Sequence, residues 1–283
     1  MTGAAVPAAR AALAAGSKSF ALAGKLLPRD CRDDAAVLYA WCRRCDDAID
    51  LAPAPSRPAA LDRMRRELDA VYAGTPLADP ALAAFAAVVR RRAIPRRYPD
   101  ELLDGFAMDV EGVRYQTLSA LHGYAYRVAG TVGVMMAHLM RASGGPALRR
   151  AANLGIAMQL TNVCRDVEED RRNGRDYLPA ELLGRGTAGA VRRLLAEADR
   201  FYASGMAGLP ALGFRCAAAV RAAALIYADI GRLIAAAGHD VGRGRAVVSR
   251  RRKLWLALRA FATEAALRGR RVLALRLAPR TAG

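Results

Sequence analysis

Aromatic residues, histidines and long apolar runs are scarce in this sequence. Phenylalanine, tryptophan and tyrosine together make up 6% of its 283 residues, and it has only three histidines. No run of about 18 apolar residues occurs, so no membrane-spanning helix is expected. Neither a GxGxxG motif nor a P-loop is present, so the sequence gives no sign of a nucleotide site.

The five cysteines do not have the spacing of a zinc site. Cys42 and Cys45 form an isolated CxxC pair, and the other three are scattered along the chain. Residues 1–16 lack the basic start and the apolar stretch of a secretory signal. We therefore expect reduced cysteines and a cytoplasmic protein.

The residues that are abundant favour helices. Apolar residues make up 54% of the chain and are mostly alanine, leucine and valine, of which alanine and leucine rank high in helix propensity. No stretch alternates with a period of two, so we expect an all-α fold and one domain over residues 1–283. Proline, glycine and capping residues divide the chain into about ten helices, expected at 17–27, 30–51, 58–73, 79–95, 100–112, 119–143, 147–172, 187–209, 214–237 and from about Arg250.

Basic residues outnumber acidic residues, and most of the excess positive charge lies at the C-terminal end. The chain has 44 Lys and Arg against 26 Asp and Glu, a net charge of +18. Residues 241–283 contain eleven arginines and one lysine but a single acid, Glu264. Such an excess favours a polyanionic partner, which is a nucleic acid, an anionic membrane or a phosphate-rich substrate.

Two acidic pairs repeat the same spacing. Asp46 and Asp50 are four residues apart in one expected helix, and Asp166 and Asp170 are four apart in another. Each pair therefore shares one helix face, where unpaired like charges cost about 0.2–0.5 kcal/mol. One interpretation is a solvated acidic face balanced by arginines. The other is a Mg²⁺ site shared with substrate phosphates, because this cation prefers carboxylate oxygens.

The residues before each pair favour the second interpretation. Asn162 and Gln159 precede Asp166 by about one and two helical turns, and Arg165 is its immediate neighbour. An asparagine inside a helix is unfavourable unless its side chain has a polar task. Tyr39 and Arg43 precede Asp46 on its own face, and arginine suits forked contacts with phosphate oxygens.

These motifs resemble the squalene/phytoene synthase family, and its bacterial phytoene synthase members most closely. The resemblance covers nearly the whole chain and includes the following segments: Lys18-Ser19-Phe20, Leu38 to Arg43, Asp46 to Asp50, Met108-Asp109, Arg114-Tyr115, Tyr124 to Gly133, and Leu154 to Pro179 with Gln159, Asn162, Arg165, Asp166, Asp170, Arg175 and Tyr177. Val163 departs from the family pattern conservatively.

The resemblance implies an isoprenoid-synthase fold around a central apolar cavity. It implies a 15-cis-phytoene synthase that condenses two geranylgeranyl diphosphates head to head through a cyclopropyl diphosphate, with Mg²⁺ or Mn²⁺ and without NADPH. By the same resemblance the metal ligands are Asp46, Asp50, Asn162, Asp166 and Asp170. The catalytic residues are the four aspartates and Tyr227, and the substrate-binding residues are Lys18, Ser19, Phe20, Tyr39, Arg43, Gln159, Arg165 and Arg245.

Several alternatives stay open at this point. A squalene-type or hopanoid-pathway synthase acting on a C15 diphosphate has the same motifs, and the high charge also fits a non-catalytic basic protein, although no DNA-reading motif is present. Tyr227 is also interpretable as a core residue and Arg245 as a surface residue. Ala129, Gly130 and Gly133 either make room for a prenyl chain or allow close helix packing.

The C-terminal segment has two interpretations as well. From Lys253 to Leu277 it mixes leucines, Trp255 and Phe261 with arginines, which fits a helix lying on the inner face of an anionic membrane. It equally fits the last core helix with solvated arginines. We expect a prenyl diphosphate substrate, no nucleic acid, and contact with downstream carotenoid enzymes.

Overall fold

The computed structural model describes residues 4–277, and side chains as far as residue 270. The described residues form helices and contain no strand, so the all-α prediction is confirmed. The helices are α1 (Ala5–Gly16), α2 (Lys18–Gly24), α3 (Arg29–Asp50), α4 (Arg57–Ala73), α5 (Pro80–Arg92), α6 (Arg97–Glu111), α7 (Leu118–Ala125), α8 (Thr131–Leu139), α9 (Gly145–Arg172), α10 (Ala180–Leu183), α11 (Gly186–Met206), α12 (Phe214–Ala236) and α13 (Arg250–Leu277).

Local capping residues explain several helix ends. The Ser17 side chain accepts a hydrogen bond from the Phe20 N–H at the start of α2, and Asp79 accepts bonds from the Ala81 and Leu82 N–H groups at the start of α5. These side chains satisfy backbone donors that have no partner within the helix. At the end of α4, Gly74 has a φ of 74°, the left-handed conformation that glycine adopts without strain.

The structure differs from the expected helices in four places, one of which is the short helix α10, which was not expected. α1 was not expected; it packs on α3, and its Arg10 is bound to Asp33. α6 begins at Arg97 and not at Asp100, whose side chain pairs with Arg96 and does not cap the helix. The expected helix at 119–143 is α7 and α8 joined by a π-helical turn, Tyr126–Gly130. Apolar spacing cannot reveal such a turn, because it adds one residue without breaking the helix.

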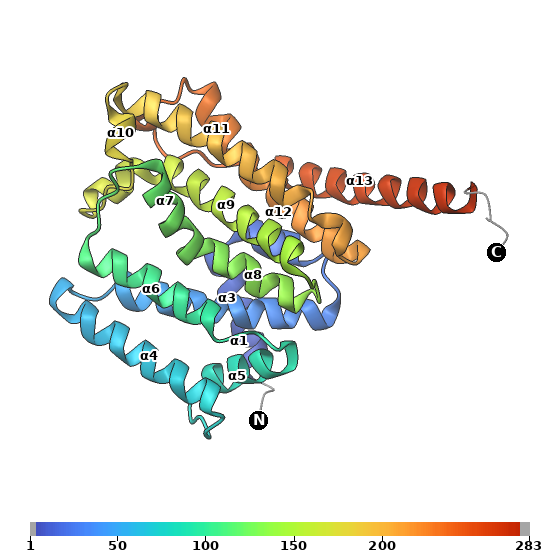
Figure 1. Ribbon diagram of the computed structural model, residues 1–283, viewed down its shortest axis with the longest axis horizontal. Coiled ribbons are helices and arrows are strands. Elements are labelled where there is room, and N and C mark those ends of the chain that lie inside the picture. The colour runs from blue at the N-terminus through green and yellow to red at the C-terminus, as the bar shows by residue number, and fades with distance from the viewer. Residues whose placement is uncertain (1–3, 278–283) are drawn as a thin grey trace.

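α9 is the central helix of the bundle. It contacts α11, α8 and α12, and Figure 1 shows it running through the middle of the molecule. One large apolar cluster joins α3, α4, α5, α6 and α8, and a second joins α7, α9, α11 and α12. Because α9 is held from several sides, side chains on its remaining face are fixed in position.

Glycines bring α9 unusually close to α8 and to the π-helical turn before it. A Cβ atom on Gly155 would lie 2.2 Å from the Ala129 carbonyl oxygen, and one on Gly133 would lie 2.4 Å from that of Ala151. Gly130 is buried and does not line the cavity described below. Close helix packing therefore accounts for Gly130, whereas Gly133 serves packing and also lines the cavity.

α13 extends away from the body of the molecule, as Figure 1 shows. Its buried face, with Leu256, Ala257 and Ala260, packs on α12. The Glu264 carboxylate is buried in the same face and pairs with Arg221. Within residues 4–277, no helix is both long enough and apolar enough to cross a bilayer.

The glycine contacts make a stability prediction. Gly155→Ala places a methyl group against backbone atoms that cannot rotate away, so it should destabilise the protein by about 1–3 kcal/mol, as overpacking does. Urea unfolding followed by circular dichroism measures the change. Gly269→Ala is the matched control, because that helical glycine has nothing within 4 Å of a new Cβ. If both variants unfold at the same urea concentration as the parent, the close packing is not needed for stability.

Candidate active site

One cavity of about 880 Å³ collects the residues that the sequence singled out. Its walls come from α1, α2, α3, α6, α7, α8, α9 and α12, and from the segments after α9 and before α13. All fourteen predicted site residues line it, and they are Lys18, Ser19, Phe20, Tyr39, Arg43, Asp46, Asp50, Gln159, Asn162, Arg165, Asp166, Asp170, Tyr227 and Arg245. The structure thus brings them together, while their individual roles stay predictions.

The first acidic pair lies near the C-terminal end of α3. Asp46 and Asp50 are one turn apart, and Tyr39 and Arg43 lie on the same face toward the N-terminus. The Arg43 guanidinium binds two carboxylates, at 3.0 Å from Asp46 Oδ2 and 2.6 Å from Asp47 Oδ1. Arg175 Nη2 lies 2.7 Å from Asp50 Oδ1. Each carboxylate of this pair therefore has an arginine partner.

The second acidic pair lies on α9. Asp166 receives a hydrogen bond of 2.8 Å from its neighbour Arg165 and is 2.9 Å from Arg245 Nε. Arg245 also lies 3.8 Å from Glu169 Oε2, so the segment between α12 and α13 is tied to the acidic end of α9. Arg245 is an ion-pair partner of the acidic residues and not an isolated surface arginine.

Asn162 has an oxygen atom with no partner. Its Nδ2 donates a 3.3 Å hydrogen bond to Gln159 Oε1, while its Oδ1 is buried and accepts none. A buried acceptor without a partner costs free energy unless a ligand satisfies it. Asn162 lines the cavity that also contains the carboxylates, so its amide oxygen fits an additional ligand for a cation or a partner for a hydrogen-bond donor.

The cavity raises the pKa of one carboxyl group in each pair. Burial raises the pKa of Asp46 to about 6, and repulsion from Asp50 adds to the effect. Burial raises the pKa of Asp170 to about 7, again with repulsion from its partner, Asp166. The anionic form of both groups is therefore destabilised, which is expected of carboxylates that bind a cation.

The donor set fits a metal that is shared with phosphate. Among the described side chains, no three carboxylate, histidine or cysteine groups converge closely enough to hold an ion by themselves. Mg²⁺ is commonly bound through one or two carboxylates together with waters and substrate phosphates. The two separate pairs and the unpartnered Asn162 oxygen match that mode of binding.

Asp109 forms a third acidic element with two tyrosines. It accepts a 2.7 Å hydrogen bond from the Tyr177 hydroxyl and bonds of 3.0 and 3.1 Å from the Tyr124 hydroxyl. Burial raises the pKa of Asp109, while the tyrosine bonds oppose the shift. This group lines the same cavity beside Arg175.

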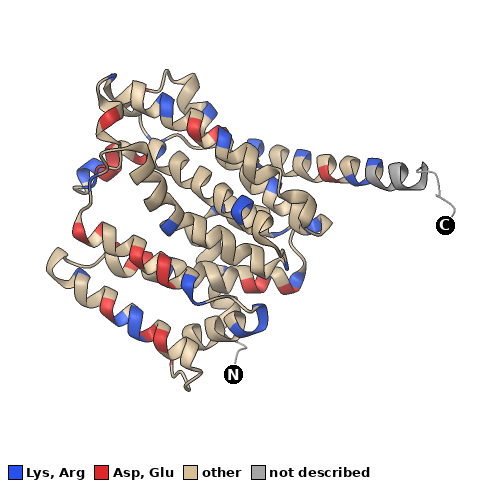
Figure 2. Ribbon diagram, viewed as in Figure 1, with Lys and Arg blue, Asp and Glu red and all other residues tan. Residues whose placement is uncertain are grey.

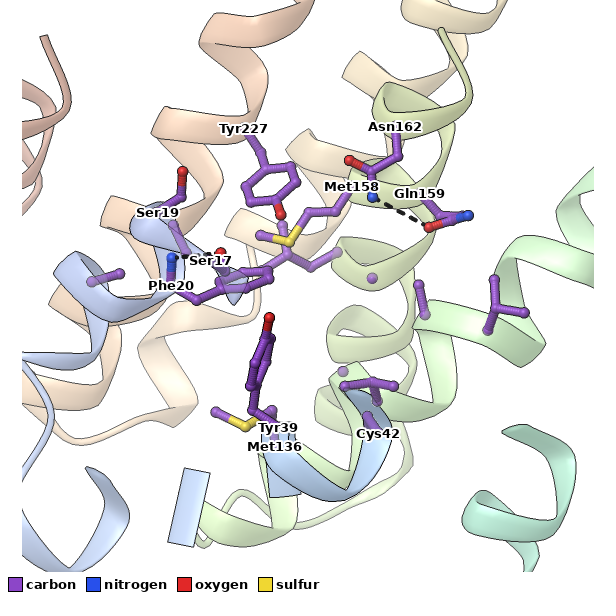
Figure 3. A pocket seen from close by; sticks show the side chains of 18 of the residues that line it. Ser17, Ser19, Phe20, Tyr39, Cys42, Met136, Met158, Gln159, Asn162 and Tyr227 are labelled. Carbon is purple, nitrogen blue, oxygen red and sulfur yellow. Dashed lines mark hydrogen bonds between the residues drawn. The ribbon is translucent and has the colours of Figure 1, made fainter. Parts of the chain in front are cut away.

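Away from the acids, the cavity has an aromatic and apolar wall. Phe20 stacks on Tyr227 with ring centroids 5.1 Å apart. Figure 3 shows Met158 beside these two rings and Tyr39 reaching toward them from α3. Tyr227 is 8% exposed, so it is part of the core and of the cavity wall at once.

Sequence reasoning did not place several polar lining residues in the site, among them Asp109, Tyr124, Arg175, Tyr177 and Lys253. Asp109 is a single acid without a second one at helical spacing, and the two tyrosines come from α7 and the loop after α9. The resemblance did include Asp109, Tyr124, Arg175 and Tyr177, which was the one available signal. Nothing in the sequence indicated that Lys253 would line the site.

Several known proteins are similar to this chain in sequence and in fold. A model of the squalene/phytoene synthase family matches residues 13–252. The 15-cis-phytoene synthase of Paracoccus sp. is 43% identical over 87% of each chain, and the phytoene synthase of Rhodobacter capsulatus is 42% identical over 85% of this chain and 76% of its own. A dehydrosqualene synthase structure, solved with a ligand, superimposes with a TM-score of 0.87 at 27% identity, covering 94% of this chain and 98% of its own.

The raised carboxyl pKa values predict how pH affects the metal-free protein. An aspartate in the unfolded chain titrates near pH 3.9, so between about pH 4 and 7 the folded protein retains protons that the unfolded chain has lost. These groups therefore reduce stability as the pH rises through that window. Asp170→Asn removes the larger shift, so its melting temperature should exceed that of the parent by a margin that is small at pH 4 and grows toward pH 8.

Differential scanning fluorimetry in EDTA measures both proteins across the pH range. Asp62→Asn is the matched control, because it removes one aspartate from an exposed position on α4. A margin that does not change with pH would contradict the assignment of Asp170 as a strained anion.

Proposed function

The chain belongs to the squalene/phytoene synthase family, and from that membership we propose that it is a 15-cis-phytoene synthase. In the reaction, two geranylgeranyl diphosphates condense head to head through a cyclopropyl diphosphate, and two diphosphates are released. The higher identity to phytoene synthases than to the dehydrosqualene synthase supports the C20 substrate.

One observation carries this proposal. The two acidic pairs, the four arginines that pair with them and an apolar wall line a single cavity, with these charged groups toward the C-terminal ends of α3 and α9. An amphiphile with a diphosphate head and a hydrocarbon tail has the matching distribution of polarity. The raised pKa values of Asp46 and Asp170 indicate that their anionic forms are destabilised in the folded protein. A basic binding protein without catalysis would have no need of carboxylates in such unfavourable positions.

The metal would be held by the predicted ligands. Asp46 and Asp50 on α3 and Asn162, Asp166 and Asp170 on α9 supply oxygen atoms that suit Mg²⁺ or Mn²⁺. When bound, the ions would act as Lewis acids that neutralise a diphosphate leaving group. The arginines that now pair with the carboxylates, Arg43, Arg165, Arg175 and Arg245, would then be available for phosphate oxygens.

Other polar residues would position the substrate. Lys18, Ser19 and Gln159 lie along the cavity wall and can bind phosphate oxygens or bridging waters. The Asp109 carboxylate holds the Tyr124 and Tyr177 hydroxyls as donors to itself, so the tyrosine rings are fixed beside the first acidic pair. This arrangement would keep the charged end of the cavity in one geometry.

The apolar wall would protect the carbocations. After a diphosphate leaves, the allylic cation must meet the double bond of the second chain and not water. Phe20, Met158 and Tyr227 surround this part of the cavity and exclude water (Figure 3). We propose that the last cation loses a proton, so no NADPH is consumed. A C15 synthase stays the second candidate because the chain shares its fold with a dehydrosqualene synthase.

We also propose that the enzyme is cytoplasmic and attaches to the inner face of the cell membrane through α13. Leu254, Trp255 and Leu258 are 45%, 48% and 72% exposed and lie on a helix whose described residues include six arginines outside its buried face. Figure 2 shows basic residues along the described part of α13, whose acid is Glu264. Lys253 lines the cavity, so this surface begins at the cavity rim. A hydrocarbon product could pass from there into the bilayer and reach downstream carotenoid enzymes.

Metal and substrate dependence tests the catalytic proposal. Geranylgeranyl diphosphate with Mg²⁺ should yield phytoene without NADPH, and removal of the metal by EDTA should abolish the product. Asp46→Ala and Asp166→Ala should each lower kcat by at least about 10³-fold, because the leaving group loses its neutralising charge. Product is identified by chromatography and mass spectrometry. Asp104→Ala on the outside of α6 is the control.

Two results would overturn this assignment. Product that appears only from the C15 diphosphate, or only with NADPH, places the enzyme in the squalene-type branch. Full turnover after verified metal removal contradicts the role of the acidic pairs.

Vesicle sedimentation tests the membrane proposal. Binding to vesicles with anionic lipids should be strong at low salt and fall as salt screens the arginines, each of which contributes on the order of 1 kcal/mol near the surface. Arg251→Glu with Leu258→Asp should reduce binding, because both residues are exposed on α13. Arg268 is a poor choice, since its guanidinium donates to the Leu212 carbonyl at 2.6 Å.

The control is Arg63→Glu with Arg66→Glu, which reverses two exposed charges on α4, at the opposite edge of the molecule in Figure 1, and lowers the net charge by four against three for the α13 pair. Equal loss of binding in both double variants would mean that net charge, and not α13, attracts the protein to vesicles. Arg271, Leu273, Arg276 and Leu277 have side chains outside the described part of the chain, as do residues 278–283.

A further inference from the structure

The cavity continues along α3 well beyond the acidic pair. Its lining residues on this helix include Asp50, Asp46, Cys42, Tyr39, Ala35 and, nearest the N-terminus, Arg32. Because α3 rises 1.5 Å per residue, the distance from Asp46 to Arg32 along the helix is about 21 Å. Arg32 therefore lies at the far end of the cavity from the diphosphate-binding groups.

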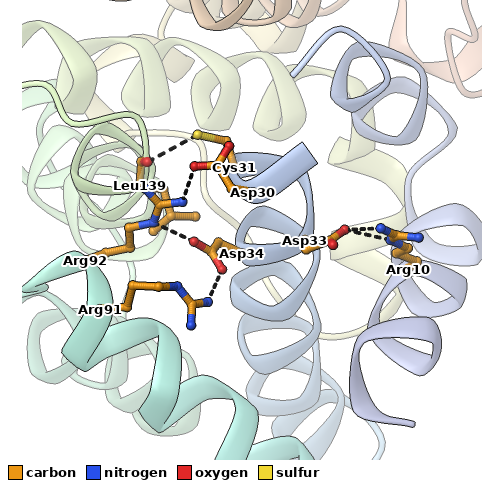
Figure 4. A network of polar contacts seen from close by, with 8 residues as sticks. All are labelled: Arg10, Asp30, Cys31, Asp33, Asp34, Arg91, Arg92 and Leu139. Carbon is orange, nitrogen blue, oxygen red and sulfur yellow. Dashed lines mark hydrogen bonds and ion pairs between the residues drawn. The ribbon is translucent and has the colours of Figure 1, made fainter. Parts of the chain in front are cut away.

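The acidic residues next to Arg32 in the sequence already have partners. Asp30 binds Arg92, Asp33 binds Arg10, and Asp34 binds both Arg91 and Arg92, as Figure 4 shows. Arg32 Nε is buried and has no hydrogen-bond partner. A buried donor without a partner is costly, so this arginine is not explained by the ion pairs that hold α3 to α5 and α1.

The cavity wall around this end is apolar. It is formed by the side chains of Leu27, Ala35, Met140, Ala147 and Leu212. An arginine in such a place commonly lays its aliphatic stem along apolar groups while its guanidinium reaches toward water. The half-buried state of Arg32 agrees with this arrangement. The stem therefore forms part of the wall, and a hydrocarbon chain that passed it would meet the charged group.

We propose that Arg32 limits the length of the prenyl chain that the cavity accepts. This inference rests on the proposed function. One helical turn, about 5.4 Å, is close to the length that one isoprenoid unit adds to an extended chain. The span from Asp46 to Arg32 is therefore about four units, which matches a C20 chain. A fifth unit would have to displace the guanidinium, and a C15 chain would leave the last turn unfilled.

The proposal predicts opposite effects for two substitutions. Arg32→Ala removes the stop, so kcat/KM for the C25 diphosphate relative to the C20 diphosphate should rise about tenfold or more. Ala35→Phe fills the cavity one turn nearer to the acids, so the ratio for C15 relative to C20 should rise by a similar factor. Initial rates with each of the three diphosphates, together with product masses, give these ratios.

Two further variants serve as controls. Arg32→Lys keeps a long stem with a charge and should retain the parent's preference. Arg29→Ala removes an exposed arginine from the first turn of α3 and should leave every ratio unchanged. Melting temperatures show which variants are folded, and if Arg32→Ala does not fold, the ratio for Ala35→Phe decides.

The outcomes separate the two proposals. If the parent enzyme makes no C40 product from the C20 diphosphate, the proposed function fails. If the parent does so but folded Arg32→Ala and Ala35→Phe have unchanged ratios, Arg32 does not limit chain length. A change in the ratios of Arg29→Ala as large as that in Arg32→Ala would also overturn the assignment.

Discussion

Repulsion among carboxylates at one end of a cavity is the constraint on which the rest of this structure depends. Asp46 and Asp170 are held where burial and a neighbouring acid raise their pKa values, so the folded protein contains anions that it does not fully stabilise. Arginines from three segments offset part of this cost in the metal-free protein. Under the proposed function, this arrangement, which is unfavourable by itself, would become favourable with cations and a diphosphate bound, and the site would then be selective for that combination.

The helix packing keeps this unfavourable arrangement in place. α9 carries one acidic pair, and it is anchored by α11 and α12 on one side and by the glycine contacts to α8 on the other. Because backbone meets backbone at Gly133 and Gly155, α9 cannot move toward α8 to relieve the repulsion. Because α8 and α9 lie so close together, the space of the cavity lies between them and the opposite wall, which α2, α3 and α12 form.

The sequence predicted the parts of this design that are periodic. Pairs such as Asp166 and Asp170, and the flanking Gln159 and Asn162, share a face at helical spacing, so their convergence on a cavity could be expected. Asp109 has no such partner along the chain, and its contacts to Tyr124 and Tyr177 exist only because three segments meet. The π-helical turn and α1 were also missed, since neither a one-residue insertion nor an alanine-rich stretch changes the apolar pattern enough to be seen.

α3 and α9 determine both where the acidic groups lie and how long the cavity is. On α3 the acids lie toward the C-terminus and Arg32 toward the N-terminus, and on α9 Asp170 and Ala147 are separated in the same way. A rigid helix fixes the distance between its two ends, so the position of the diphosphate determines where the hydrocarbon tail must stop. If Arg32 acts as we propose, substrate length is set by the residue that lies a given number of turns from the acids. A change in length preference would then not require any change in the residues proposed to bind the diphosphate.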